Sequence, residues 1–271
     1  MEYVTAAGVE VPALGFGTAR MDAYETEYRA VETALEAGYR HVDTAQIYGS
    51  EPAVGDALAD AELDREDVFL TTKLAGGNRA YDAVVESTRE SLEALGTSYV
   101  DLLLIHWPVE DVPTEETLRA MNDLRADGLV RHVGVSNFSV PQLREAREAS
   151  DAPVLTDQVE YHARNRQDEL LAYCVDEGVM LTAYSPLGVG ELLDEEALVA
   201  VGDRHGKTPA QVAIRWLLQQ PMVATVPMSS SPAHVRENYD VFDFELSTAE
   251  MRELFALEGD LDADLADTLG L

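Results

Sequence analysis

The sequence has little of two residue types that most proteins use freely. Among 271 residues there is one cysteine, Cys174, and there are two lysines, Lys73 and Lys207, against 17 arginines. A single cysteine excludes an intrachain disulfide and any metal site built on several cysteines. The six histidines show no paired ligand spacing, so we expect no metal.

Long apolar runs are also missing, since none approaches the length of a membrane span. The residues after Met1 contain no basic stretch followed by an apolar one, which predicts that there is no signal peptide. We therefore expect a cytoplasmic protein.

Positive charge is scarce as well: 51 Asp and Glu face 19 Lys and Arg, so the formal net charge is −32. Such a surface repels phosphate, which argues against nucleic acids and anionic membranes as partners. It also disfavours self-association, which favours a monomer without excluding a dimer. An acidic, lysine-poor surface is typical of proteins that work in concentrated salt, because the Debye length falls to about 3 Å at 1 M and carboxylate repulsion is screened. We favour an extreme halophile as the source over an ordinary acidic protein.

What the chain does have is a regular alternation of short apolar runs and amphipathic helical patterns. Hydrophobic residues make up 46%, enough for a core, and no linker divides the chain, so residues 1–271 are read as a single domain. Eight runs are predicted as strands: Leu14–Gly17, His41–Thr44, Val68–Lys73, Leu102–His106, His132–Ser136, Val154–Val159, Met180–Tyr184 and Val223–Val226.

The helical segments between these strands carry clear boundary signals. Gly38 and Gly96 follow the last periodic residues of two of them, and Thr208 and Ser247 begin capping boxes. Eight strands alternating with helices over this length predict an α/β protein with a (β/α)8 TIM barrel. A doubly wound open sheet is the alternative, but the Gly15–Arg20 segment lacks the third glycine of its fingerprint. Residues 3–11 are predicted to form an N-terminal β-hairpin that plugs the barrel.

Ionisable side chains lie where the predicted strands end, and the active site of such a barrel gathers there. Asp43, Lys73 and His106 each end a strand, and Tyr48 follows Asp43 by five residues. Each has a bland alternative: a helix cap, a surface lysine, a core histidine and a packed aromatic. Their convergence at one mouth, in a chain with so few lysines, favours catalysis.

A tyrosine beside a lysine has a specific use. A free phenol has a pKa near 10, and a neighbouring ammonium is expected to lower it. With Asp43 holding Lys73 protonated, Tyr48 could give a proton to a carbonyl oxygen, and a neutral His106 could donate a hydrogen bond to the same oxygen. This equipment suits carbonyl reduction, with the hydride supplied by a cofactor.

Two long motifs give these residues a family context. The first is Gly38–Ala45 followed by Glu51 and the pair Val54-Gly55, and the second is Met121 followed by residues 131–138. Over nearly its whole length the chain resembles an aldo-keto reductase of the prokaryotic type.

The resemblance implies an extended NADP(H) and assigns a role to each of several residues. Asp43, Tyr48, Lys73 and His106 would form the catalytic tetrad, with Tyr48 as general acid. The substrate would meet Tyr48, His106 and Trp107. The cofactor would contact Thr18, Asp43, Ser136, Asn137, Gln158, Tyr184, Ser185, Leu187, Met228, Ser229, His234, Glu237 and Asn238.

The family's third motif is where the chain departs from the pattern. Met228 stands where the family has a lysine and His234 where it has an arginine, and these two cations hold the 2′-phosphate of NADP(H). Losing them predicts use of NAD(H), alone or beside NADP(H). Ser229, its two following serines or Arg236 could restore phosphate binding.

The segment 108–115 and the C-terminal tail are short, and Ala19 and Arg20 stand where a bulky aromatic is common in the family. An open pocket for small aldehydes, α-dicarbonyls or sugar-derived carbonyls is therefore expected. Two alternatives are a Lys73 Schiff-base lyase and a cofactor-sensing barrel with little or no catalysis. Cys174 is expected to be a buried helix residue.

Overall fold

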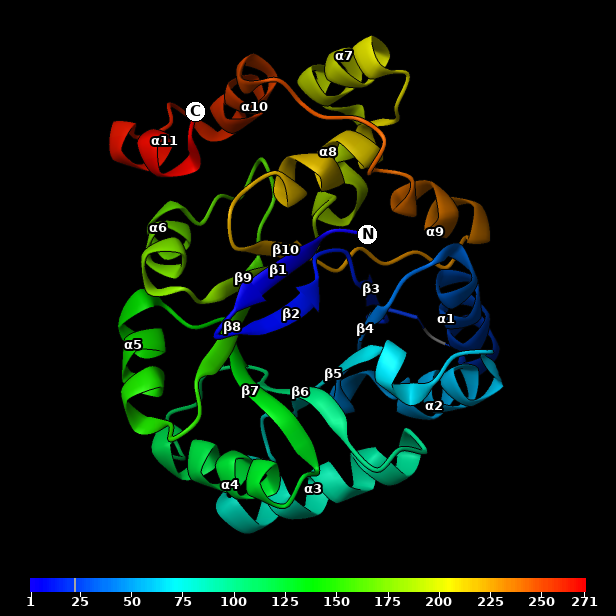
Figure 1. The fold of residues 1–271 in the computed structure, drawn as a ribbon, viewed down its shortest axis with the longest axis vertical. Helices are drawn as coiled ribbons and strands as arrows, with labels where there is room; N and C mark the ends of the chain where they lie inside the picture. The colour runs from blue at the N-terminus through cyan, green and yellow to red at the C-terminus, as the bar shows by residue number, and fades with distance from the viewer. Residues whose placement is uncertain (22) are drawn as a thin grey trace.

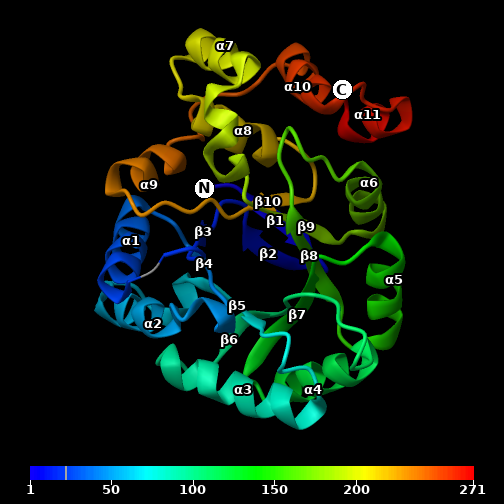
Figure 2. The same ribbon diagram turned by 180° about the vertical axis from the view of Figure 1, so that it is seen from behind.

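The computed structural model describes residues 1–21 and 23–271. Eight strands form one parallel sheet in the order β10-β9-β8-β7-β6-β5-β4-β3. Its two edges join, because Leu14 forms a parallel bridge with Thr225 and the Gly15 amide donates to the Thr225 carbonyl at 2.8 Å. The sheet is therefore a closed barrel, and Figure 1 and Figure 2 show the ring of helices around it from opposite ends.

All eight predicted barrel strands are present. The barrel strands are β3 (Phe16–Gly17), β4 (His41–Asp43), β5 (Phe69–Leu74), β6 (Val100–Ile105), β7 (Val130–Ser136), β8 (Val154–Glu160), β9 (Met180–Tyr184) and β10 (Val223–Thr225). The first is shorter than predicted, because Leu14 pairs by a single bridge with β10 while only Phe16 and Gly17 pair with β4. Gly17 is needed at this closure, since a Cβ there would lie 2.8 Å from the Val226 carbonyl oxygen.

The helices follow the strands in chain order. They are α1 (Tyr24–Ala37), α2 (Glu51–Asp60), α3 (Tyr81–Ala94), α4 (Thr114–Ala126), α5 (Val140–Ala149), α6 (Asp168–Glu177), α7 (Glu196–His205), α8 (Pro209–Leu218), α9 (Pro232–Tyr239), α10 (Thr248–Phe255) and α11 (Ala263–Leu269). Short 3-10 turns are η1 (Gln46–Tyr48), η2 (Arg65–Asp67), η3 (Gly188–Asp194) and η4 (Ala256–Glu258). Helices α7, α10 and α11 lie outside the ring, at the top of Figure 1.

The helix boundaries agree with the sequence signals. Helix α1 ends at Gly38, whose φ of +112° is a conformation that favours glycine. Both predicted capping boxes are present, at Thr208 and at Ser247. On α1 itself Val31 is fully buried, whereas Tyr24 is 49% exposed.

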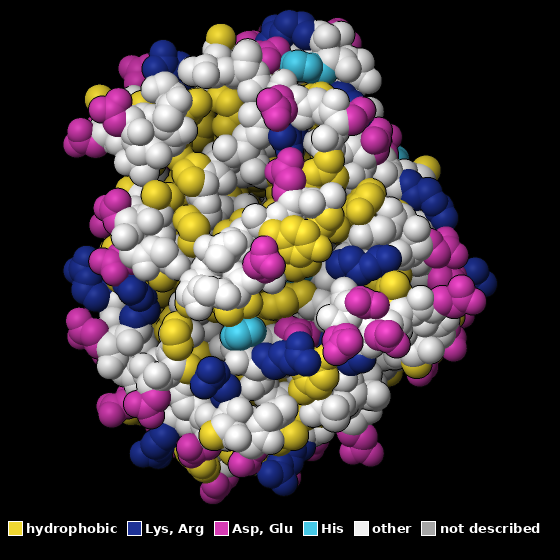
Figure 3. All heavy atoms as spheres, viewed as in Figure 1, with side chains coloured by type: hydrophobic (Ala, Val, Ile, Leu, Met, Phe, Trp, Pro, Cys, Tyr) yellow, Lys and Arg dark blue, Asp and Glu magenta, His cyan; other side chains and the backbone are white. Residues whose placement is uncertain are grey.

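The charged surface surrounds this frame. Figure 3 shows acidic side chains all around the edge of the face that carries the N-terminus. Among the helices that the structure describes, none is both long enough and apolar enough to cross a lipid bilayer.

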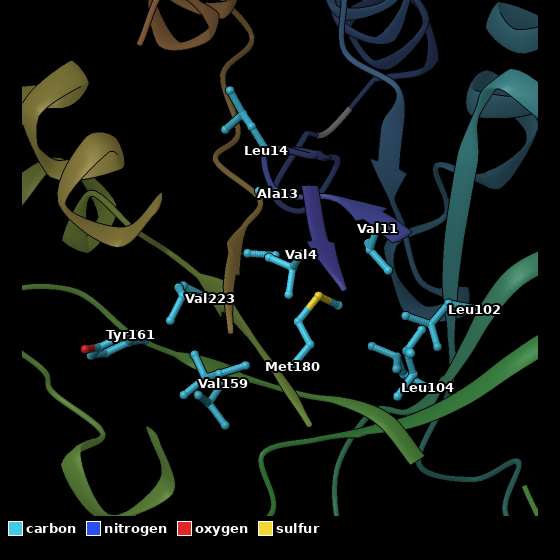
Figure 4. Close-up of a cluster of buried hydrophobic side chains, with 14 of the residues drawn as sticks. Val4, Val11, Ala13, Leu14, Leu102, Leu104, Val159, Tyr161, Met180 and Val223 are labelled. Atoms are coloured by element: carbon cyan, nitrogen blue, oxygen red, sulfur yellow. The ribbon is translucent and has the colours of Figure 1, made fainter. Parts of the chain in front are cut away.

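The predicted hairpin closes the N-terminal end of the barrel. Strands β1 (Tyr3–Ala6) and β2 (Val9–Pro12) pair antiparallel. Figure 4 shows Val4 and Val11 among apolar side chains of the barrel strands, including Leu102 and Met180. Because both valines are nearly inaccessible to solvent, this end is sealed and a ligand must enter at the other.

Candidate active site

A cavity of about 940 Å³ opens at the carboxyl ends of the barrel strands. Asp43, Tyr48 and His106 all line it, and they come from the end of β4, the end of η1 and the residue after β6. Lys73 lies in β5 behind this wall, and its side chain is only 1% exposed. Parallel strands of one barrel place these residues side by side although up to 63 positions separate them in the sequence.

The buried pair of Asp43 and Lys73 forms the base of the site. Lys73 Nζ donates to Asp43 Oδ1 at 2.5 Å and to the Thr44 carbonyl at 2.9 Å. The second carboxylate oxygen accepts Gln158 Nε2 at 2.8 Å. Burial is the largest single effect on Lys73 and opposes its charged form, but the charges of Asp43 and Tyr48 and the hydrogen bonds to both together outweigh it and raise the Lys73 pKa above its ordinary value. The ammonium therefore stays charged and fixed.

Tyr48 lies above this pair, and its oxygen is 3.5 Å from His106 Nε2. The ammonium of Lys73 is 5.1 Å from the centre of the Tyr48 ring. Burial raises the pKa of Tyr48 above its ordinary value, while the positive charge of Lys73 acts in the opposite direction and is the weaker effect. The expected lowering of this pKa is thus wrong in net sign, because desolvation exceeds the charge effect. The phenol keeps its proton at neutral pH.

His106 is neutral, as the sequence predicted. Burial, followed by the positive charge of Lys73, lowers its pKa to about 4. Within the described residues its buried Nδ1 has no hydrogen-bond partner, which a neutral ring tolerates better than an imidazolium would. With the proton on Nε2, His106 can donate toward the place that the Tyr48 hydroxyl also faces.

The ends of β7, β8 and β9 are joined by a hydrogen-bond network. Asn137 has a left-handed backbone with φ of 63°, and its amide donates to the His106 carbonyl at 3.1 Å. Tyr184 donates its hydroxyl to Asn137 Oδ1 at 2.9 Å, and Ser136 donates to the Gln158 carbonyl at 2.7 Å. Because Asn137 links His106 to Tyr184, these parts of the cavity wall are held in one arrangement.

The remaining predicted site residues divide into two groups. Those that line the same cavity are Ser185, Leu187, Met228, Ser229, His234, Glu237, Asn238 and Trp107. Thr18 does not line it, because this buried residue turns its hydroxyl toward the Asp43 carbonyl at 3.2 Å and Ser50 Oγ at 3.0 Å.

Several cavity residues were not predicted from the sequence. They are Ile47, Glu160, Val189, Leu193 and, as a charged lining group, Arg20. Three of them are apolar side chains exposed to solvent: Ile47 at 58%, Val189 at 63% and Leu193 at 39%. Val189 also has a φ of 56°, which is rare for a β-branched residue. Neither property can be read from one sequence.

Metal-ligating clusters are a separate matter. In residues 1–21 and 23–271 no three His, Cys, Asp or Glu side chains are grouped so that they could hold a metal ion. Cys174 is fully buried in α6, and burial raises the pKa of its thiol well above the ordinary value, so it is inert.

Comparison with known proteins agrees with this geometry. The model of the Aldo/keto reductase family matches residues 13–258. Glyoxal reductase of Bacillus subtilis (strain 168) is 40% identical over 253 residues, which cover 93% of this chain and 91% of that protein. A solved structure of a putative 2,5-diketo-D-gluconic acid reductase B is 46% identical with a TM-score of 0.93, covering 95% of this chain and 91% of that one. Aldose reductase of Schistosoma japonicum is 35% identical with a TM-score of 0.91, covering 100% and 97%.

Proposed function

The chain belongs to the aldo/keto reductase family, and from this premise we propose that Tyr48 and His106 carry its reaction. It is an NAD(P)H-dependent oxidoreductase that reduces aldehydes or ketones to alcohols. The observation behind the assignment is that a protonated phenol and a neutral imidazole, 3.5 Å apart, face one cavity above a buried ion pair.

The proposed mechanism uses these groups in one step. A carbonyl oxygen lies between the Tyr48 hydroxyl and His106 Nε2 and accepts a hydrogen bond from each. A reduced nicotinamide, when bound, supplies the hydride and its two electrons to the carbonyl carbon. As negative charge grows on the oxygen, Tyr48 transfers its proton and His106 stabilises the charge. Lys73 stabilises the phenolate that remains until solvent returns a proton.

The residues of the cavity fit a nicotinamide dinucleotide. Ser136, Asn137 and Gln158 would hold the carboxamide, and the ring of Tyr184, kept in place by its bond to Asn137, would stack on the nicotinamide. Ser185 and Leu187 would follow the diphosphate, and Glu237 and Asn238 would meet the adenine, since all four line the same cavity. Thr18 is left out of this set because its side chain faces away.

The cofactor preference follows from the far end of the cavity. Met228 and His234 line that end, where the family's pattern has two cations. Arg236 is bound to Glu36 on α1 at 3.1 Å, so it is engaged elsewhere. The chain therefore uses NADH alone or both cofactors, because a lost charge-assisted contact costs about 1.5–3 kcal/mol for NADPH only.

The substrates are small carbonyls, with α-dicarbonyls and sugar-derived carbonyls first among them. Among the described residues, none beyond Asn238 lines the cavity, so the C-terminal segment adds no wall to it. The relatives are named for glyoxal and for diketogluconate, both dicarbonyl compounds. Trp107, 50% exposed at the rim, would be a wall for the substrate.

Lys73 does not suit a Schiff-base lyase. Its ammonium is bound by Asp43 and Thr44, its pKa is raised and it lies outside the cavity lining, whereas a nucleophilic lysine must be neutral and reachable. Failure of borohydride to trap substrate on the protein is the expected result.

Concentrated salt is the proposed environment, with the chain a cytoplasmic monomer there. Both lysines are held in ion pairs: Lys73 in the buried pair with Asp43, and Lys207, whose side chain is 9% exposed, with the exposed carboxylates of Asp240 and Asp243. The surface thus depends on arginine alone for its positive charge.

Oxidation of NADH and NADPH with a panel of glyoxal, methylglyoxal and simple aldehydes in concentrated KCl tests the function. Turnover that Tyr48→Phe removes is expected, with NADH at least as effective as NADPH. No turnover despite cofactor binding would instead favour the sensing barrel, and NADPH bound at least tenfold more tightly than NADH would refute the cofactor proposal.

A further inference from the structure

The loop between β5 and α3 contains a buried cation that the reaction does not use. Arg79 is only 1% exposed. Burial lowers the pKa of its guanidinium to about 10, and no charge of opposite sign contributes to this value in the described part of the chain. The group is therefore a cation at neutral pH. Burying a charge without a counter-charge is costly, and its hydrogen bonds show what the side chain holds.

The guanidinium joins two elements that follow β5 in the chain. Its Nε donates to Thr117 Oγ1 on α4 at 3.3 Å, and the same hydroxyl donates to the Arg79 carbonyl at 2.7 Å. Its Nη1 donates to the carbonyl oxygen of Trp107, while the buried Nη2 has no partner among the described residues. Because the guanidinium is planar, the bond of Nε to α4 fixes the direction in which Nη1 points.

Trp107 belongs to the segment that carries the catalytic histidine. It follows His106, which is the first residue after β6. The His106 carbonyl accepts the side-chain amide of Asn137 at 3.1 Å, and the next carbonyl, that of Trp107, accepts Arg79. Since β5 and β7 flank β6, two consecutive carbonyls are held from both sides by side chains that follow the neighbouring strands.

The indole of Trp107 stands beside the imidazole of His106 in the cavity. The two rings are nearly parallel, with 19° between their planes and 6.4 Å between their centres, and both residues line the cavity. Trp107 is 50% exposed, so packing covers only part of its side chain. The orientation of the indole therefore depends on how firmly its backbone is held.

We propose that Arg79 is a positioning residue that holds the backbone of Trp107, so that the indole forms a fixed wall for the substrate. This rests on the proposed function above, in which Trp107 borders the substrate. Arg79 does not line the cavity itself, so it acts only through Trp107. A carbonyl compound large enough to reach the indole should depend on Arg79, whereas a small one that meets only Tyr48 and His106 should not.

Fluorescence tests the position of the wall without any turnover. The chain has two tryptophans, Trp107 and the buried Trp216, so Trp216→Phe leaves Trp107 as the only one. In this background and in concentrated KCl, Arg79→Met should lower the fluorescence anisotropy and increase quenching by acrylamide. Arg79→Lys should give intermediate values, because an ammonium keeps the charge but does not reproduce the planar fork that joins Thr117 to Trp107.

Kinetics with two aldehydes tests the consequence for the substrate. Arg79→Met should lower kcat/KM for benzaldehyde by about ten- to a hundredfold, chiefly through a higher KM, and should change that for glyoxal little. In a chain that already carries Trp107→Ala, Arg79→Met should cause no further rise in KM, since the ring that it positions is gone.

Arg40→Met is the matched control. The Arg40 guanidinium also donates to two backbone carbonyls, those of Leu35 and Tyr39 at 3.1 Å and 2.7 Å, and it lies outside the cavity. This variant should keep the anisotropy and both KM values of the reference chain, even where it lowers Tm.

Unchanged anisotropy and an unchanged KM for benzaldehyde in Arg79→Met would overturn the proposal and leave Arg79 as a link between the loop and α4. Equal losses for both aldehydes through kcat would also overturn it, because His106 and not Trp107 would then have moved. If Arg79→Met does not fold, the same comparison with Arg79→Lys decides. If the reference chain reduces neither aldehyde, the proposed function fails, while the anisotropy still decides the role of Arg79.

Discussion

The hydroxyl oxygen of Tyr48 lies 3.5 Å from Nε2 of His106, and the two rings meet edge to face at 81°. In the proposed mechanism, two donors that converge in this way would hold the carbonyl oxygen between them. Since the pKa of Tyr48 is raised and that of His106 is lowered, the phenol is the acid and the imidazole stays a neutral donor. The site is thus prepared for reduction without any change of protonation before substrate arrives.

Replacing the acid should stop the chemistry and spare cofactor binding. Tyr48→Phe is expected to lower kcat by about 10²–10⁴-fold, the usual contribution of a general acid. Tyr184→Phe is the matched control, because it removes a phenol from the same cavity but breaks only the bond to Asn137. That variant should raise the cofactor KM more than it lowers kcat. Equal losses of kcat in both variants would contradict the assignment.

The pH profile should be governed by His106 on the acid side. Its pKa of about 4 means that the ring is neutral above that value, so kcat with NADH should be constant from about pH 5.5 to 8 and fall as pH approaches 4. NADH is the cofactor to use, because it carries no 2′-phosphate. A fall of kcat already between pH 7 and 6 would show an imidazole with an ordinary pKa and overturn the reasoning from burial.

The pair of Asp43 and Lys73 should behave as a unit in stability. Asp43→Asn leaves the buried ammonium without its counter-charge, which costs about 3–5 kcal/mol, and Lys73→Met leaves the carboxylate in the same position. Combining both changes should recover part of that loss in urea unfolding, while activity stays absent because Tyr48 has lost its neighbour. Simple addition of the two destabilisations would contradict the coupling.

A second buried carboxyl, Asp157 in β8, lacks the cationic partner that Asp43 has in Lys73 among the described residues. Burial raises its pKa to about 8, the Phe138 amide donates to Oδ1 at 3.4 Å, and Oδ2 has no partner among the described residues. In the unfolded chain the group ionises near pH 4. The contribution of Asp157 to stability is therefore greatest below about pH 4, and this contribution is lost progressively as pH rises from about 4 to 8.

Asp157→Asn removes this penalty while keeping an acceptor for the Phe138 amide. The variant should unfold at a higher temperature than the wild-type chain at pH 8, by an amount worth a few kcal/mol at most, about the size of the titration penalty. The difference should shrink as pH falls toward 5. A gain in Tm that is equal at pH 5 and pH 8 would mean that titration of Asp157 is not its cause.

The comparison of Asp157 with Asp43 shows how far a sequence can lead. The positions of the strands, the capping boxes and the convergence of Asp43, Tyr48 and His106 follow from local patterns and one topological rule, that strand ends of a barrel meet. The alternation of a strand also predicts that Asp157 and Gln158 face opposite ways. The pKa of a buried carboxyl such as Asp157 depends on its burial and on partners far away in the sequence. No local sequence pattern contains this information.

The same limit explains the errors at Tyr48 and Thr18. A lysine near a tyrosine was predictable, but the size of the desolvation that reverses its effect was not. Thr18 is adjacent in the sequence to residues that line the cavity, but its hydroxyl forms hydrogen bonds with Ser50 and the Asp43 carbonyl instead. In both cases a competing tertiary contact decided the outcome.

The acidic surface leads to the last prediction, that the fold needs salt. With a net charge of −32, repulsion between carboxylates is long-ranged at low ionic strength, while each exposed ion pair returns only about 0–1 kcal/mol. Several surface aspartates take neutral partners instead: Tyr28 donates to Asp60 at 2.9 Å and Tyr81 to Asp123 at 2.6 Å, and neither bond gains from low salt. Repulsion between carboxylates should therefore destabilise the folded chain when salt is removed.

Urea unfolding at 3 M and at 0.1 M KCl measures this balance. The midpoint should be clearly lower at 0.1 M, and acidification to about pH 5 at low salt should not restore it fully, because most carboxylates remain ionised there. Sucrose at 0.1 M KCl is the control for solvent exclusion, which stabilises compact states without screening charge. A chain equally stable at both salt concentrations would show that its ion pairs balance the repulsion, and the proposed environment would be wrong.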